Sequence, residues 1–210
     1  MTRIRRETAA PDALRRLQEG NERYSKNLRS VDSMMSHNRL DLLETPQRPV
    51  AIIVGCSDAR APAETVFDQG LGDLFVIRVA GNIVAPSQIG SVEFAAERFG
   101  TRLVVVMGHT RCGAIDAAIE AIRGESDAGS RNLASIVDRV RPAIDSVVRG
   151  STADLDTIRR AALRANVVAS VTGLRNGSDI IHRLASEDGL VIVGADLDLT
   201  TGVVDFFHGV

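Results

Sequence analysis

The sequence has no tryptophan, one tyrosine and only two cysteines among its 210 residues. So few aromatic rings leave little to stack on nucleic-acid bases, and a net charge of −2 gives no excess of positive charge for phosphates. Two cysteines do not make a disulfide scaffold in a chain of this length; in a reducing compartment they serve as core thiols, metal ligands or nucleophiles. We therefore expect no nucleic-acid partner. For the two thiols we expect a role other than disulfide formation.

Long apolar runs are absent as well. No apolar stretch approaches the roughly 18 residues that span a membrane. The basic N-terminus, "MTRIRRETAAPDALRR", lacks the apolar core of a secretory signal. We expect no membrane partner and a cytoplasmic location. The length, the 44% hydrophobic content and the lack of repeats or linkers fit a single domain over residues 1–210.

Short apolar strands alternate with helices along the chain. Strands are predicted at 49–55, 73–79, 102–108 and 189–195, with a short edge strand in "GVVDFFHG" at 202–209. The first four do not alternate polar and apolar residues, which indicates a sheet covered on both faces and hence parallel. Helices are predicted at 10–24, 33–44, 62–68, 86–99 and 112–123, and from about 131 to 186 with breaks near Gly150 and Gly177. This order predicts an α/β fold with a mainly parallel β-sheet flanked by helices.

Two polar segments follow the first and third predicted strands, "GCSDAR" at 55–60 and "GHTRCGA" at 108–114. Parallel sheets bind ligands beyond the carboxyl ends of their strands, so both segments should reach one rim. Cys56, His109 and Cys112 there make a plausible zinc site, because zinc prefers sulfur and imidazole. Three protein ligands leave a fourth position open, as in catalytic sites. Buried core thiols remain the alternative.

Asp58 and Arg60 lie next to Cys56. Asp58 could cap the following helix, and Arg60 could be an ordinary surface charge. Alternatively, Arg60 pairs with Asp58 and keeps it ionised and directed at a metal. A phosphatase loop of the Cys-x5-Arg type is excluded because residue 62 is Pro62, and a CxxC redox pair is absent. A Cys–His nucleophile pair remains possible, but it gives Cys112 no role.

The pair "CSDAR" and "GHTRCGA", with "FDQGLGDLFVIRVAGNIV" between them, strongly resembles the β-class carbonic anhydrases. The resemblance runs from "LQEGNERY" to "VGADLDLTTG". It implies a carbonic anhydrase that reversibly hydrates carbon dioxide to bicarbonate and a proton through zinc-bound hydroxide, with one Zn²⁺ per chain. It implies that the ligands are Cys56, His109 and Cys112 and that the catalytic pair is Asp58 and Arg60. It also implies a homodimer or homotetramer, in which an N-terminal helical arm (1–45), preceding the α/β core (46–210), packs on a partner subunit.

Five further positions match the family's substrate pocket. The resemblance implies that the Gln47 side chain hydrogen-bonds the substrate and that the backbone N–H of Gly113 faces it. Phe75, Ala80 and Phe94 would form a dry wall for the apolar substrate. Phe94 stands where the family usually has a tyrosine contributed across the dimer interface, so this wall lacks a hydroxyl here.

The resemblance also bears on inhibition by bicarbonate, on the fourth zinc ligand and on the pH dependence of activity. An inhibitory bicarbonate site of some members uses a tryptophan, an arginine and a tyrosine; this chain has Ile53, Arg78 and Leu197, which predicts no such site. Members also differ in whether the aspartate or water takes the fourth zinc position, and the sequence does not choose between them. Two thiolates reduce the positive charge of zinc, so we expect activity that rises on the alkaline side.

Other functions for the same residues stay open. A CO2-like substrate, carbon disulfide or carbonyl sulfide, would use the same fold. A non-catalytic relative could bind zinc or bicarbonate as a sensor, but it would be expected to lose Asp58, Arg60 or a ligand. A purely structural zinc site is disfavoured by the intact Asp–Arg pair beside an open coordination position.

Overall fold

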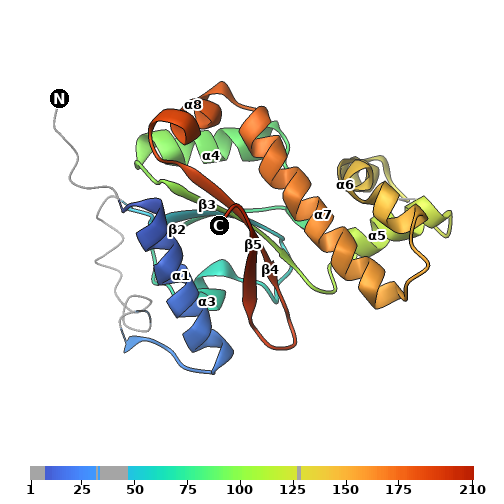
Figure 1. Cartoon of the computed structure of the whole chain (residues 1–210), viewed down its shortest axis with the longest axis horizontal. Helices are drawn as coiled ribbons and strands as arrows, with labels where there is room; N and C mark the ends of the chain where they lie inside the picture. Colours follow the sequence, from blue (N-terminus) through green and yellow to red (C-terminus); the bar gives the residue numbers. More distant parts are fainter. Residues whose placement is uncertain (1–7, 32, 34–46, 127–128) are drawn as a thin grey trace.

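The structure is a computed structural model, and it describes residues 8–31, 33, 47–126 and 129–210. These residues form a five-stranded sheet at the centre of the molecule, in the order β2-β1-β3-β4-β5 (Figure 1). The strands are β1 (Ala51–Gly55), β2 (Leu74–Arg78), β3 (Leu103–His109), β4 (Val191–Leu197) and β5 (Val204–His208). The first four run parallel, and β5 pairs with β4 in the antiparallel direction. The predicted parallel sheet and its edge strand are confirmed.

The apolar runs of the central strands supply two separate cores. Successive side chains of a strand point to opposite faces. Ile53, Val105 and Val193 therefore pack under α1 (Ala10–Ser25) and α3 (Ala63–Val66). The alternate residues, such as Ile52, Val104 and Ile192, pack under three helices on the other face: α4 (Pro86–Arg98), α7 (Leu155–Asn176) and α8 (Asp179–Glu187). Both faces are covered, which explains the absence of polar alternation in these strands.

A third apolar cluster lies beyond the sheet. It joins α5 (Gly113–Arg123), α6 (Arg131–Arg149) and the first turns of α7, and it reaches Cys56 and Cys112. Figure 1 shows α7 running from the α5–α6 pair at one side of the molecule back across the sheet. The C-caps of α6 and α7 are Gly150 and Gly177, the predicted break points.

The N-terminal helix α1 packs against its own chain. Ala13 and Leu17 are fully buried in the cluster that includes Ile53 and Val105. The helix predicted at 33–44 lies, apart from Ser33, outside the described residues. The packing of the 1–45 arm on a partner subunit therefore stays a prediction. No helix in the described part of the chain combines the length and the apolar composition needed to cross a membrane.

Candidate metal centre

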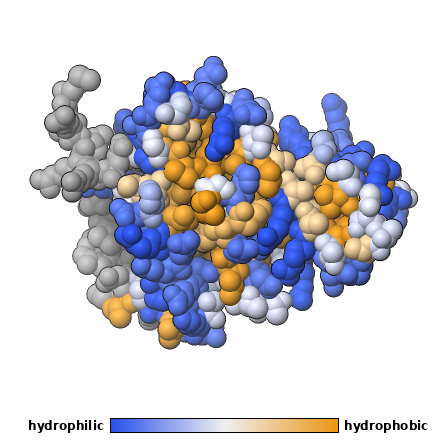
Figure 2. Space-filling view, viewed as in Figure 1, coloured by the Kyte–Doolittle hydropathy of each residue, from blue (hydrophilic) through white to orange (hydrophobic). Residues whose placement is uncertain are grey.

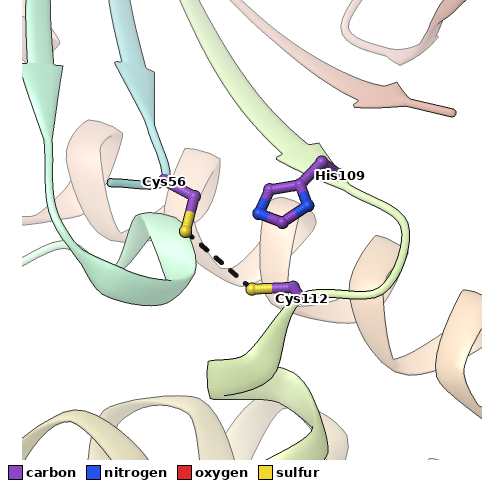
Figure 3. Close-up of side chains that lie close together, drawn as sticks. All are labelled: Cys56, His109 and Cys112. Carbon is purple, nitrogen blue, oxygen red and sulfur yellow. Dashed lines mark hydrogen bonds between the residues drawn. The ribbon is translucent and has the colours of Figure 1, made fainter. Parts of the chain in front are cut away.

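The two predicted polar segments meet at one rim of the sheet. Cys56 follows the last residue of β1, His109 is the last residue of β3, and Cys112 is the N-cap of α5. Because β1 and β3 are paired neighbours, their carboxyl ends lie side by side. Figure 3 shows the three side chains pointing toward one another. Their ligand atoms all lie within 4.8 Å of one another, and all three residues are buried.

The imidazole of His109 is oriented for a ligand. Its Nδ1 lies 2.9 Å from the carbonyl oxygen of Thr110, and since a carbonyl can only accept, Nδ1 carries the proton. In the neutral ring Nε2 is then unprotonated, and this buried atom has no hydrogen-bond partner in the structure. A buried nitrogen without a partner is costly unless something binds it. Histidine ligands of metals typically donate their other ring nitrogen to a carbonyl in this way.

The two thiols complete a donor set that suits a soft divalent cation. Their Sγ atoms are 4.0 Å apart, and the backbone N–H of Gly81 donates to Cys56 Sγ at 3.4 Å. The hydrogen bond from Cys112 lowers the pKa of Cys56 to about 4, despite burial. The same hydrogen bond, with burial, raises the pKa of Cys112. One thiolate therefore forms readily in this site, and a cation would be needed to stabilise two. This arrangement fits zinc.

Asp58 and Arg60 form a fork-like ion pair beside these ligands. Arg60 Nε donates to Asp58 Oδ1 at 2.9 Å, and Arg60 Nη2 donates to Oδ2 at 2.7 Å. The Arg60 guanidinium thereby holds the pKa of the Asp58 carboxyl well below its usual range, so Asp58 is ionised at neutral pH. Its Oδ2 lies 3.8 Å from His109 Nε2. A charged carboxylate thus stands next to the atom that lacks a partner.

Several supporting residues were not identified from the sequence as parts of this site. The Thr110 carbonyl and the Gly81 N–H act through the backbone, so residue type gives no signal for them. Arg78 donates from Nε to the Cys56 carbonyl at 2.8 Å, and from Nη2 to the Asp58 carbonyl. Its place beside Cys56 follows from the parallel register of β1 and β2, which pairs Gly55 with Arg78. Sequence shows that Arg78 lies at the end of a predicted strand, but its contact with the Cys56 turn depends on the strand order.

The predicted substrate-pocket residues separate into two groups. Ala80 begins the 3-10 turn η2 (Ala80–Asn82), whose Gly81 contacts Cys56, and Gly113 follows Cys112 at the start of α5. Gln47, in contrast, is exposed and precedes β1, whereas Cys56 follows it. Five residues of strand separate the two by roughly 17 Å. The structure therefore does not bring Gln47 to the ligands of its own chain.

Phe75 and Phe94 also lie away from the rim that carries the ligands. Phe75 pairs in register with Ile52, near the start of β1. Its ring centroid is 6.2 Å from that of Phe94 on α4, and both contact Phe99. Phe94 is 54% exposed, which is unusual for a large apolar side chain. These rings form an aromatic patch (Phe75, Phe94 and Phe99) at the opposite end of β1 and β2 from Cys56.

A pocket of about 170 Å³ opens on the α7 side of the ligands. Its lining includes His109 and Cys112, together with charged side chains of α5 and α7, but not Asp58 or Arg60. The Arg60 side chain donates to the carbonyl of Arg111 at 3.2 Å, while Arg111 itself lines the pocket. The 110–112 loop therefore stands between this pocket and the Asp58–Arg60 pair.

Comparison with known sequences agrees with this geometry. The sequence model of the family described as "Carbonic anhydrase" matches residues 51–204, which contain all three candidate ligands and the Asp58–Arg60 pair. Carbonic anhydrase 2 of Mycobacterium tuberculosis (strain ATCC 25618 / H37Rv) is 35% identical over 190 residues, which cover 90% of this chain and 89% of the relative. A carbonic anhydrase of Mycolicibacterium smegmatis is 34% identical over 193 residues, covering 92% and 91% of the two chains.

Solved structures show the same fold. A β-carbonic anhydrase of Aspergillus fumigatus matches with a TM-score of 0.74 at 23% identity, covering 90% of this chain and 88% of that one. One of two tetrameric β-carbonic anhydrases from Sordaria macrospora matches with a TM-score of 0.72 at 23% identity, covering 90% and 93%. At this level of identity the structural likeness concerns the fold.

Proposed function

Because the chain belongs to the β-carbonic anhydrase family, we propose that it catalyses the reversible hydration of carbon dioxide to bicarbonate and a proton. The observation that carries the proposal is the buried cluster of Cys56, His109 and Cys112 with an ionised Asp58 beside it. We assign one Zn²⁺ per chain to this cluster. When bound, zinc lowers the pKa of a water ligand so that hydroxide is available near neutral pH.

Each residue of the site has a separate task. The Thr110 carbonyl fixes the proton on His109 Nδ1 and leaves Nε2 for the metal. Arg60 keeps the Asp58 carboxylate charged and aimed at the space beside Nε2, where it accepts a hydrogen bond and orients the attacking oxygen. The backbone N–H of Gly113 and the side chain of Gln47 are the donors proposed for the substrate oxygens, where negative charge develops.

We assign the aromatic wall and Gln47 to a neighbouring subunit. Gln47, Phe75 and Phe94 lie at the far end of β1 and β2 from their own Cys56, so they could complete only the site of a second copy. The exposed Phe94 ring at the surface of the aromatic patch supports such contact. Figure 2 shows another apolar area, over β5 and the C-terminus, where Val210 is 71% exposed. We propose a homodimer, or a homotetramer built from dimers.

Two further proposals concern the cellular location and inhibition by bicarbonate. Two reduced cysteines as metal ligands fit a reducing compartment, so we propose the cytoplasm. Ile53 and Leu197 are buried among apolar side chains, and neither carries a group that could hydrogen-bond bicarbonate. This supports the absence of the inhibitory bicarbonate site.

Stopped-flow hydration of carbon dioxide tests the proposal on protein with verified zinc content. We expect a fast rate that increases from neutral to alkaline pH, and a loss of at least ~100-fold in Asp58→Ala, because that variant loses the group that orients the attacking oxygen. Asp12→Asn, a change in an exposed ion pair of α1, serves as the control and should keep the rate. A zinc-loaded wild-type protein without activity at alkaline pH would contradict the proposal and favour carbonyl sulfide, carbon disulfide or a sensor role.

A further inference from the structure

Arg78 holds the backbone of the turn that carries both a metal ligand and the catalytic aspartate. It is the last residue of β2, and the parallel register places it opposite Gly55, one residue before Cys56. Its Nε donates to the Cys56 carbonyl at 2.8 Å, and its Nη2 donates to the Asp58 carbonyl. One planar guanidinium thus bonds two carbonyls that are two residues apart, a geometry that lysine cannot reproduce.

The position of this turn decides where the Asp58 carboxylate lies. Its Oδ2 is 3.8 Å from His109 Nε2, so a displacement of the turn would change how close the carboxylate comes to the metal ligands. Arg60 bonds both oxygens of this carboxylate and so restrains its position. The Arg60 side chain bonds the Asp58 carboxylate and the Arg111 carbonyl, whereas Arg78 bonds the main chain from which the Asp58 side chain extends.

We propose that Arg78 is a positioning residue: it holds the Cys56–Asp58 turn so that Asp58 stays paired with Arg60 and leaves the fourth metal position free. This role rests on the proposed metal centre. Hydrogen bonds to charged donors are strong enough to fix a short turn.

Azide binding to the cobalt(II)-substituted protein tests the inference without relying on turnover. Azide occupies a free coordination position of the metal, and the visible spectrum of cobalt reports it. The variants are Arg78→Met, Arg78→Lys, Asp58→Asn and the double variant Arg78→Met/Asp58→Asn. Arg183→Met is the matched control, because Arg183 is an exposed arginine paired with Glu97 on the surface at 3.1 Å.

We expect Arg78→Met to bind one cobalt per chain but to bind azide about 10- to 100-fold more weakly than wild type, the range typical of groups that orient metal ligands. Arg78→Lys should show a smaller loss, and Arg183→Met none. The double variant should regain azide binding, because an amide at position 58 is a poor ligand for the metal. Carbon dioxide hydration should fall in Arg78→Met mainly through kcat.

Two results would overturn the inference. Azide binding by Arg78→Met equal to that of wild type would show that the turn needs no clamp. Weak binding in the double variant as well would show general damage to the site rather than closure by Asp58. If Arg78→Met does not fold, the same comparison is made with Arg78→Lys and its Asp58→Asn double variant. A wild-type protein that fails to bind cobalt would instead contradict the metal centre itself.

Discussion

Asp68 shows how a single buried charge is made tolerable in this fold. Its side chain is fully buried, and Arg23 Nε donates to Oδ2 at 2.6 Å, together with the backbone N–H of Ser30 at 3.0 Å. Burial would raise the pKa of Asp68, but the hydrogen bonds from Arg23 and Ser30 outweigh it and lower the pKa. The carboxylate therefore ties the end of α1 to the segment that follows α3.

The charge on Asp68 predicts a pH-dependent contribution to stability. Because the folded-state pKa is lowered, this contribution is present above the unfolded value of about 3.9 and is lost as the pH falls through the folded value. Asp68→Asn should lower the free energy of unfolding by roughly 2 kcal/mol at about pH 7 and by less at about pH 3. Urea unfolding of both proteins at the two pH values measures this, with the exposed Asp12→Asn as control. An equal loss at both pH values would assign the effect to packing rather than charge.

At the scale of elements, the buried side-chain amide of Asn21 links α1 to two other elements by hydrogen bonds. The Asn21 side chain donates to the carbonyls of Val66 and Gly202, at 3.2 and 2.8 Å. Its Oδ1 accepts from the N–H of Val204 at 2.8 Å. This side chain thus joins α1 to α3 and to the start of β5, which are far apart in sequence.

Replacing Asn21 with leucine should therefore weaken three elements together. The variant keeps a similar volume but leaves three backbone groups without their partner, so we expect a loss of about 3 kcal/mol in unfolding free energy. Urea denaturation followed by circular dichroism measures it. Asn176→Leu, at the exposed end of α7, should stay within about 0.5 kcal/mol of wild type. A similarly small change in Asn21→Leu would mean that water replaces the lost partner.

Most elements could be predicted from sequence because their signals are local. Continuous apolar runs mark β1 to β4, and the breaks at Gly150 and Gly177 are visible as helix ends. The convergence of Cys56, His109 and Cys112 also follows from sequence, since parallel strands end at one rim. Apolar content alone gives no strand order, so the contact between Arg78 and the Cys56 turn needed the structure.

The placement of the substrate wall could have been reasoned further from sequence. The predicted strand 49–55 already separates Gln47 from Cys56, because one residue precedes the strand and the other follows it. What sequence could not show is that Phe75 and Phe94 share that far end, since this depends on the register of β2 and on the packing of α4. Hydrogen bonds through backbone groups, such as that of Thr110, leave no trace in residue type.

For the whole molecule, the proposed roles of Gln47, Phe75 and Phe94 would leave one chain without a complete site. In a symmetric dimer each chain would supply a metal centre to one site and Gln47, Phe75 and Phe94 to the other. Gln47 and Cys56 are close in sequence, but β1 lies between them and holds them at opposite ends of the sheet. Activity should therefore depend on association.

Mixing two inactive variants tests this sharing. Asp58→Ala lacks the catalytic carboxylate, and Gln47→Ala lacks the proposed substrate donor. Half of randomly mixed dimers pair one chain of each kind, and one of their two sites is then intact, so about one quarter of wild-type activity should return. Stopped-flow assays after dissociation and reassociation measure it, with each variant reassociated alone as the control. Activity equal to the average of the two parents would place Gln47 in its own chain's site.

The distance along the chain between the two thiols has a consequence for biosynthesis. Cys56 and Cys112 are 56 positions apart, so at ordinary rates of translation Cys56 is made roughly 3–10 s before its partner. During that interval no second sulfur is available, and β1 lacks the neighbouring strand β3 that delivers His109. The nascent chain therefore carries a single thiol without the Cys112 neighbour that lowers its pKa, and a complete set of metal ligands exists only once residue 112 has been made.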